Sequence, residues 1–203
     1  MKKLFFGIYN PSIILTYVSV FCSLCGMALL QQAAPHIPTV LVLLIAAVCC
    51  DMFDGRVARL CKRTQQEKDF GIQLDSLADT VSFVVFPALL ILKLSGFSLL
   101  SFLAGGLYLF AGIMRLGWFN ITADANPGMF QGLPVAYVVL VYPLLYLALV
   151  FSHSAHMGAW FLLAEAGLSL LMIGNFHMKK PGLKVLLAFT ALAVLVTVVL
   201  LGM

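Results

Sequence analysis

The feature that most constrains this chain is a series of apolar runs, each long enough to cross a lipid bilayer. A helical crossing needs about 20 predominantly apolar residues. Hydropathy places seven such runs at residues 12–31, 38–60, 71–94, 97–118, 132–151, 158–176 and 183–202. Of all residues, 63% are hydrophobic and only 10% are charged, which excludes an ordinary water-soluble domain. We therefore predict an all-α fold, a polytopic transmembrane helical bundle.

The basic residues predict the orientation of this bundle. The net charge of +4 is not gathered into the patch that nucleic-acid binding requires, so we expect no nucleic-acid partner. If the N-terminus is cytoplasmic, eleven of the twelve Lys and Arg residues lie on or near the inner side, and only Lys93 lies outside. The positive-inside rule predicts such a bias. The run that follows Lys2 and Lys3 is too long for a signal peptide, and we interpret it as a retained first span.

The remaining polar segments give no sign of a second domain. Connections are short, and neither a repeat nor a long linker is present, so we expect residues 1–203 to form a single membrane-embedded domain. The longest inner polar segments are residues 61–70 and 120–131. Four of the five cysteines lie within apolar runs, where we interpret them as packing residues and assign them no chemistry.

Four aspartates form two closely spaced pairs within 29 residues, around the second and third runs. The chain reads D-M-F-D-G-R-V-A-R from Asp51, and G-I-Q-L-D-S-L-A-D ending at Asp79. On a helix, Asp51 and Asp54 share one face, as do Asp75 and Asp79. Because a short inner loop joins the two helices, we expect all four carboxylates to face one another near the inner membrane surface.

Four facing carboxylates inside a membrane boundary require neutralisation, because each unpaired charge at a helix centre costs about 2.5 to 3.5 kcal/mol. Arg56 and Arg59 could form a purely structural ion-pair network with them. The alternative is a metal site, since hard cations such as Mg²⁺, Mn²⁺ or Ca²⁺ prefer all-oxygen ligands. Two divalent ions balance four negative charges, and such a pair is a known device for phosphoryl transfer.

The spacing D-x2-D-G-x2-A-R-x11-G-x3-D-x3-D resembles the signature of the CDP-alcohol phosphotransferase family. The resemblance implies an intramembrane enzyme in which Asp51, Asp54, Asp75 and Asp79 bind two divalent metals that hold the diphosphate of a CDP-linked lipid. It also implies that Asp79 is the base on the acceptor hydroxyl. Further implications are nucleotide contacts by Gly55, Ala58, Arg59 and Gly71, a six-span core to which the last span is an addition, and a homodimer.

A second resemblance concerns the acceptor. The segments from Met52 to Arg59 and from Gln73 to Phe83 are similar to those of small bacterial and archaeal CDP-diacylglycerol:serine phosphatidyltransferases. R-L-G-W-F-N from Arg115 and F-Q-G-L-P from Phe130 resemble two further segments of that group. The chain departs from its pattern at Phe86, before Pro87, and at Gly117, where alanine is usual. A bacterial inner membrane location, with a cytoplasmic active site, follows from the same resemblance.

Serine is a zwitterion, so its pocket needs a cation or amide donors for the carboxylate. Arg115, Asn120 and Gln131 could bind it from the inner ends of the fourth and fifth spans. Alternatively, Arg115 only snorkels to the interface, and Asn120 only caps a helix. Thr16, on the first span, is a candidate ligand of the CDP-lipid, although hydroxyls in membrane helices commonly bond their own backbone.

We therefore predict transfer of a phosphatidyl group from CDP-diacylglycerol to L-serine, which yields phosphatidylserine and CMP. The same chemistry with glycerol 3-phosphate or inositol phosphate is the alternative, and it requires Lys62, Arg63 and Lys68 to point into the cavity. A cation transporter is an alternative from another class. It is disfavoured because the four aspartates lie near one membrane face. Glu165 is the only deeper acidic residue, and the sequence gives it no role.

Overall fold

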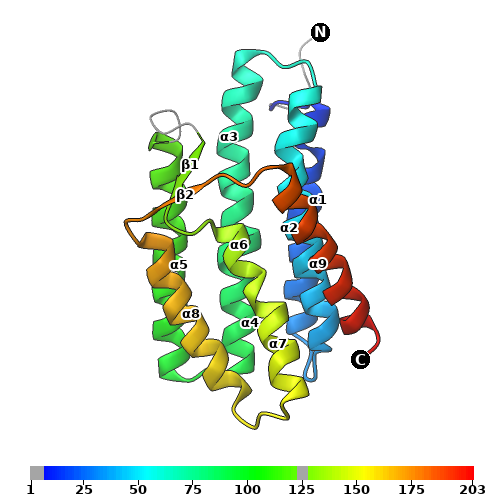
Figure 1. Cartoon of the computed structure of the whole chain (residues 1–203), viewed down its shortest axis with the longest axis vertical. Helices are drawn as coiled ribbons and strands as arrows, with labels where there is room; N and C mark the ends of the chain where they lie inside the picture. The colour runs from blue at the N-terminus through cyan, green and yellow to red at the C-terminus, as the bar shows by residue number, and fades with distance from the viewer. Residues whose placement is uncertain (1–6, 123–127) are drawn as a thin grey trace.

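The computed structural model describes residues 7–122 and 128–203 as a bundle of membrane-length helices (Figure 1). Lys2 and Lys3, which were used to predict the orientation, lie outside the described residues. The helices are α1 (Ile14–Leu30), α2 (Ile37–Leu60), α3 (Gln65–Asp79), α4 (Phe86–Leu94), α5 (Leu99–Thr122), α6 (Val135–Val139), α7 (Val141–Phe151), α8 (Met157–Ile173) and α9 (Leu183–Leu201). The shorter elements are the 3₁₀ turn η1 (Pro11–Ile13), the π-helical turn η2 (Thr80–Val85), and the strands β1 (Met129–Gln131) and β2 (His177–Lys179).

The predicted all-α membrane bundle is confirmed. Within the described residues, five helical stretches are long and apolar enough to span a membrane, and residues 135–151 and 157–173 form two shorter apolar ones. Successive stretches run up and down the bundle, so the α2–α3 connection lies at one end and the α1–α2, α4–α5 and α7–α8 connections lie at the other (Figure 1). Lys93 lies at this second end, where its ammonium donates to the carbonyl of Gln32 at 3.0 Å.

The third span begins at Gln65 rather than at residue 71, because a capping box extends it. The Thr64 hydroxyl accepts from the backbone N–H of Glu67, and the Glu67 carboxylate accepts from the backbone N–H of Thr64 at 2.7 Å. These reciprocal bonds satisfy N–H groups that a helix start otherwise leaves without partners. The additional turns carry α3 beyond the neighbouring helices at this end of the bundle (Figure 1).

A two-stranded antiparallel ribbon is an addition to the prediction. Strands β1 and β2 pair with Phe130 opposite Met178. At the end of β1 the chain turns at Gly132, which has a positive φ of 69° and whose N–H donates to the carbonyl of Phe176 at 2.8 Å. A Cβ at Gly132 would overlap the carbonyl of Met172, so glycine is needed both for the turn and for the close approach to the end of α8.

The third span changes its helical geometry immediately after Asp79, through the π-helical turn η2. Pro87 has no N–H, so in a regular helix the carbonyl of Phe83 would lack its usual donor. The hydroxyl of Tyr108 on α5 supplies this bond at 2.9 Å, and both side chains are fully buried. The proline therefore accounts for the irregular turn, and a bond from the neighbouring helix compensates for the missing one.

Phe86, one of the two departures from the serine-type pattern, packs in the core between α4 and α1. Its side chain is fully buried, and a Cβ added at Gly26 on α1 would overlap its ring. Gly112 makes a similar close approach on α5, where a Cβ would lie 2.7 Å from a methyl carbon of Val84. Large side chains opposite glycines therefore set the close helix spacing in this part of the bundle.

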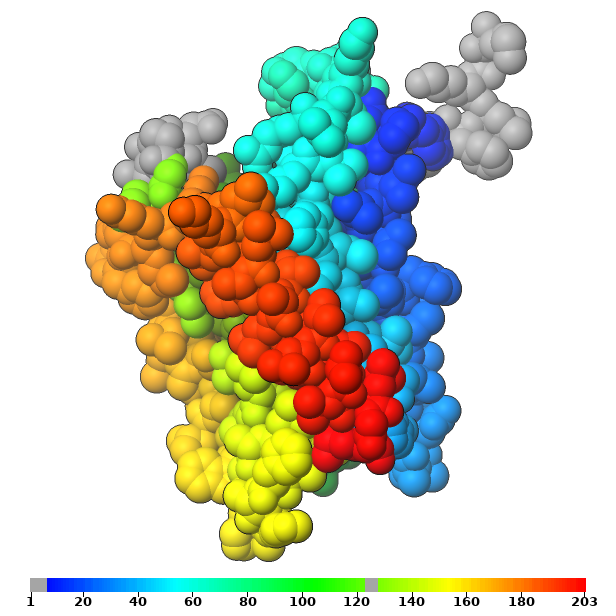
Figure 2. Space-filling model, turned by 45° about the vertical axis from the view of Figure 1, so that its right-hand side comes forward, coloured from blue at the N-terminus to red at the C-terminus, as the bar shows by residue number. Residues whose placement is uncertain are grey.

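The last span, α9, lies on the outside of the bundle against α2 and α7. Figure 2 shows it running diagonally across the surface. The connection from β2 to α9 crosses the face of the bundle at the end where the α2–α3 connection lies (Figure 1). This path matters for the site, because it carries residues of the α8–α9 connection toward the aspartates.

We predict that Gly26→Ala destabilises the chain, because the added methyl group collides with the buried ring of Phe86. Such overpacking costs about 1–3 kcal/mol. The control is Gly167→Ala on α8, where an added Cβ meets no atom within 4 Å. This exchange should be neutral or stabilise the helix by about 0.5–1 kcal/mol. Unfolding in mixed detergent micelles measures both variants. Equal effects of the two exchanges, or no recovery in the double variant Gly26→Ala/Phe86→Leu, would contradict this account of the packing.

Candidate active site

The aspartates are positioned by the hairpin that α2 and α3 form. Asn10, just before η1, ties the base of this hairpin to the N-terminal segment. Its side-chain amide donates to the carbonyl of Lys62 and to the carboxylate of Glu67, each at 3.2 Å. Its carbonyl oxygen accepts from the N–H of Ser12 at 3.0 Å. The start of the first helix and the α2–α3 turn are therefore fixed relative to each other.

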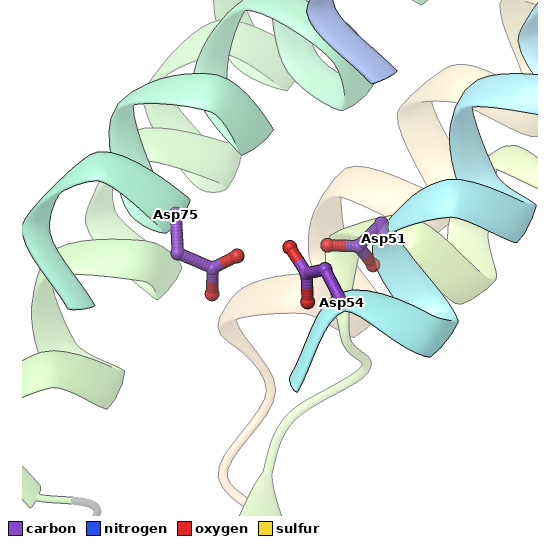
Figure 3. Close-up of side chains that lie close together, drawn as sticks. All are labelled: Asp51, Asp54 and Asp75. Atoms are coloured by element: carbon purple, nitrogen blue, oxygen red, sulfur yellow. The ribbon is translucent and has the colours of Figure 1, made fainter. Parts of the chain in front are cut away.

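Three carboxylates converge between the two helices. Asp51 and Asp54 project from α2 and Asp75 projects from α3 toward them (Figure 3). One carboxylate oxygen of each lies within 4.8 Å of the others. Asp54 is 9% exposed, and the other two are partly buried. Converging, partly desolvated carboxylates repel one another strongly unless a cation or a shared proton lies between them.

Asp79 is not a member of this group of three, but it adjoins it. The carboxyl groups of Asp79 and Asp51 are close enough to hydrogen-bond, and so are those of Asp75 and Asp54. All four side chains line one cavity. The hairpin thus brings together every acidic residue of the sequence motif, with Asp79 one turn deeper along the third span than Asp75.

Thr16 of α1 contacts the acidic cluster from a third helix. Its hydroxyl donates to the carboxylate of Asp54 at 2.8 Å, and its side chain is 7% exposed. Ser19, one turn along, donates to the carbonyl of Ala47 on α2 at 3.0 Å. Neither hydroxyl is bonded to its own helix, so Thr16 contacts the acidic cluster directly and fixes the orientation of one carboxylate.

Two cavities meet at the aspartates. The smaller, about 220 Å³, is lined by Asp54 and Asp75 and by residues of η1, α1, α2, the α2–α3 connection and α3, namely Ser12, Ile13, Thr16, Gly55, Ala58, Arg59, Arg63, Lys68, Gly71 and Ile72. It therefore contains Thr16, Gly55, Ala58, Arg59 and Gly71, the residues predicted to contact the CDP-lipid. The backbones of Gly55 and Gly71 are open on this side, since an added Cβ would meet no atom within 3.5 Å at either.

The larger cavity, about 430 Å³, contains all four aspartates and extends away from α1 toward α5 and α6. Arg56, Arg59, Arg115 and Lys180 supply its positive charges. Part of its wall is aromatic and consists of Phe119 of α5, Phe130 of β1 and Tyr137 of α6. Ala58 and Gly71 thus line only the smaller cavity and the aromatic rings line only the larger one, whereas basic groups line both.

The three predicted acceptor residues occupy different environments. Arg115 lines the larger cavity and is 7% exposed, and two buried guanidinium nitrogens, Nε and Nη2, have no hydrogen-bond partner in the part of the chain that the structure describes. Asn120 also lines this cavity, and its amide nitrogen donates to Ser76 at 2.8 Å.

Gln131 lines a separate, smaller pocket. It accepts from the Trp118 indole at 2.9 Å and donates to Asn175 at 2.8 Å, so it connects α5, β1 and the end of α8. The structure thus brings Arg115 and Asn120 beside the aspartates, and it places Gln131 in a connecting role outside their cavity.

Basic residues of the α2–α3 connection and of α3 line the smaller cavity. Arg63 and Lys68 line it, whereas Lys62 lines neither cavity beside the aspartates. The alternative function, with an acceptor that carries a phosphate, requires Lys62, Arg63 and Lys68 all to point into the site. Glu165, on α8, is fully buried and lines neither of these two cavities, so it does not extend the acidic cluster across the bundle.

Sequence reasoning missed Lys180, Phe119, Phe130 and Tyr137 as wall residues of the larger cavity. In the sequence, Lys180 contributed only to the predicted orientation of the bundle, because it lies several residues after the sixth span. Pairing of β1 with β2 brings it back to the cavity, and its backbone N–H donates to the carbonyl of Gly128 at 2.9 Å. The repeated aromatic residues near the predicted acceptor segments were the available signal.

The acidic group fits a divalent cation. It offers only carboxylate oxygens, which hard cations prefer, and its oxygens lie close enough together to share one ion. The hydroxyl of Thr16 orients one of these carboxylates, as the outer partners of metal ligands commonly do.

Comparison with known proteins agrees with this geometry. Residues 9–199 match the CDP-alcohol phosphatidyltransferase family. The CDP-diacylglycerol–serine O-phosphatidyltransferase of Mycobacterium leprae is 33% identical over 181 residues, covering 84% of this chain and 59% of the relative. The enzyme of that name from Helicobacter pylori is 39% identical over 103 residues, covering 49% and 42%. The archaetidylserine synthase of Methanothermobacter thermautotrophicus is 34% identical over 137 residues, covering 67% and 56%.

This chain therefore spans about 42–59% of the length of these three relatives. The family match covers nearly all of the described bundle and includes every residue of the acidic motif. The chain belongs to the CDP-alcohol phosphatidyltransferase family.

Proposed function

We propose that the chain transfers a phosphatidyl group from CDP-diacylglycerol to L-serine, which yields phosphatidylserine and CMP. The observation that carries this proposal is the convergence of Asp51, Asp54, Asp75 and Asp79 where a cavity lined by small motif residues meets a larger cavity lined by aromatic rings. Family membership supports the use of a CDP-linked donor. The names of the relatives, two of which are serine phosphatidyltransferases, support serine as the acceptor.

Asp51, Asp54, Asp75 and Asp79 are proposed to hold two divalent cations, Mg²⁺ or Mn²⁺, with Ca²⁺ as a further candidate. Four carboxylates balance the charge of two such ions. When bound, the cations supply positive charge that stabilises the diphosphate and the CMP leaving group. The close approach of the four carboxyl groups supports this assignment, because their mutual repulsion requires a positive partner.

The smaller cavity is proposed to bind the nucleotide of the donor. Gly55, Ala58 and Gly71 leave room for a bulky group to approach the backbones of α2 and α3. Arg59 lines both cavities, and its Nε is held by the carbonyl of Gly55 at 3.0 Å. Its guanidinium is therefore near the junction, where the diphosphate would lie.

Asp79 is proposed to act as the base. A serine hydroxyl is a poor nucleophile at neutral pH, so a carboxylate within hydrogen-bonding distance must take its proton as the oxygen attacks phosphorus. The bond from phosphorus to the CMP oxygen breaks as the bond to the serine oxygen forms. Asp79 lines the larger cavity but not the smaller one, so it faces the acceptor side. Arg115 and Asn120, on the same side, are proposed to bind the acceptor.

The membrane setting is proposed to follow the family. The helices place the aspartates near the end of the bundle where Arg59 and Lys68 lie, opposite Lys93. The positive-inside rule then favours a cytoplasmic active site in a bacterial inner membrane. We propose that the whole chain acts as one catalytic domain. A homodimer is supported by Gly105 and Gly106 on α5, where an added Cβ meets no atom within 4 Å.

We predict that Asp79→Asn lowers the rate of serine-dependent CMP release by 10²–10⁴-fold, because the amide cannot accept the proton. The assay combines purified chain, CDP-diacylglycerol, L-serine and Mg²⁺ or Mn²⁺. The matched control is Asp69→Asn, the same chemical change on the same helix, at a residue whose carboxylate accepts from Gln65 outside both cavities. Comparable activity of the two variants would exclude Asp79 as the base.

The same assay decides between acceptors. We expect CMP release with L-serine but not with glycerol 3-phosphate or inositol phosphate. Release only with a phosphorylated alcohol would keep the family and overturn serine. Release with none of the three acceptors, with the metal present, would contradict the proposed transferase activity.

We predict that Thr16→Val weakens metal activation, because it removes the hydrogen bond that orients Asp54. The loss of such an outer partner raises the metal concentration needed for half-maximal rate by roughly 10–100-fold. Thr16→Ser, which keeps the hydroxyl, should stay near the wild type. Mg²⁺ titration of CMP release measures both variants. An effect confined to the apparent affinity for CDP-diacylglycerol would instead mean that Thr16 contacts the donor directly.

A further inference from the structure

Two positively charged side chains share one pair of aromatic rings in the larger cavity. The Arg115 guanidinium carbon lies 5.2 Å from the ring centroid of Phe119 and 5.6 Å from that of Phe130. The Lys180 ammonium lies 5.4 Å and 5.3 Å from the same two centroids. The ring centroids are themselves 5.6 Å apart. Three segments far apart in the sequence thus build one cationic, aromatic cluster.

Within the described residues this cluster forms no ion pair, although Asp79 and Asp51 lie close enough to act on the charge of Arg115. Arg115 is 7% exposed, and its Nε and Nη2 are buried with no hydrogen-bond partner among those residues. Burying an unpartnered charge costs several kcal/mol, and cation–π contacts recover only about 0.5–2 kcal/mol each. Arg115 also lines the larger cavity, so its positive charge acts there. An anionic ligand in this cavity would lower the cost of the buried charge.

The position of Lys180 indicates which anion the cluster receives. Arg115 and Lys180 line the larger cavity and not the smaller one, which contains the motif glycines. The donor nucleotide is assigned to the glycine side, so these cations face the space left for the acceptor. The Arg115 guanidinium carbon and the Lys180 ammonium both lie within 5.4 Å of the Phe119 ring centroid. The distance between the two cations is therefore less than twice 5.4 Å.

We propose that Lys180, together with Arg115, binds the carboxylate of the amino-acid acceptor. This inference rests on the proposed function and adds a specificity-determining residue to it. The backbone of Lys180 is fixed by its bond to Gly128, whereas its side chain is exposed at the cavity and rests on the two rings. Phe119 and Phe130 hold the ammonium at the cavity that contains Asp79 without neutralising it. The ammonium of Lys180 therefore remains available to a carboxylate.

The neighbouring lysine provides a matched control. Lys179 is the last residue of β2 and pairs with Met129, and it does not line the larger cavity. Lys180→Met and Lys179→Met remove the same charge from adjacent positions, so a general electrostatic effect should appear in both. Lys180→Arg keeps the charge at the position under test. Thermal unfolding in detergent confirms that each variant is folded before kinetics are compared.

The experiment compares L-serine with L-serinamide, which keeps the hydroxyl and the ammonium but lacks the carboxylate. CMP release from CDP-diacylglycerol is measured for each acceptor. Lys180→Met should raise KM for L-serine about tenfold, with kcat within about twofold, and leave KM for serinamide unchanged. The preference for serine over serinamide then falls about tenfold. Lys179→Met should keep the wild-type preference, and Lys180→Arg should restore most of it.

The outcomes separate this inference from the function on which it rests. If wild-type chain releases no CMP with L-serine, the proposed function fails, and the inference fails with it. If wild type uses serine and Lys180→Met keeps the full preference, the inference alone is wrong. A rise confined to the KM for CDP-diacylglycerol would also overturn it, because Lys180 would then serve the donor. If serinamide is not a substrate, its inhibition constant against serine replaces KM in the comparison.

Discussion

The mutual repulsion of four aspartates inside a membrane-length bundle is the constraint on which the rest of the site depends. Two antiparallel helices hold these carboxyl groups within hydrogen-bonding distance in pairs. The neighbouring structure keeps them there. Thr16 orients Asp54 from a third helix, and Asn10 fixes the turn that joins α2 to α3. A site built in this way needs a cation or a shared proton between its carboxyl groups, and the proposed divalent cations would supply that positive charge.

Much of this could be predicted from the sequence, because it depends on local periodicity. The apolar runs predicted the spans, and helical spacing predicted that the aspartates of each pair share a face. Thr64 and Glu67 form a capping pattern that could also have predicted the earlier start of α3. The pairing of β1 with β2 depends on segments some fifty residues apart, so no local pattern predicted it. Lys180 reaches the cavity only through that pairing.

The two sides of the aspartates differ in a way that suits two different ligands. Small residues leave the backbone open on the side of α1, where a nucleotide would need space. Aromatic rings and basic groups line the other side, where a small zwitterion would need a charged anchor. Pro87 links this site to the core, because the π-helical turn it causes begins directly after Asp79 and is secured by Tyr108. The departure at Phe86 is accommodated by Gly26 in the core, and Phe86 lines neither cavity.

The central claim is that the four aspartates bind divalent cations. Its most direct test is a crystal structure of the chain soaked with Mn²⁺, with anomalous diffraction to locate the ions. The account predicts two anomalous peaks among Asp51, Asp54, Asp75 and Asp79, about 3.5 to 4 Å apart, and loss of at least one peak in Asp75→Asn. Saturating Mn²⁺ with no peak among these four carboxylates would contradict it.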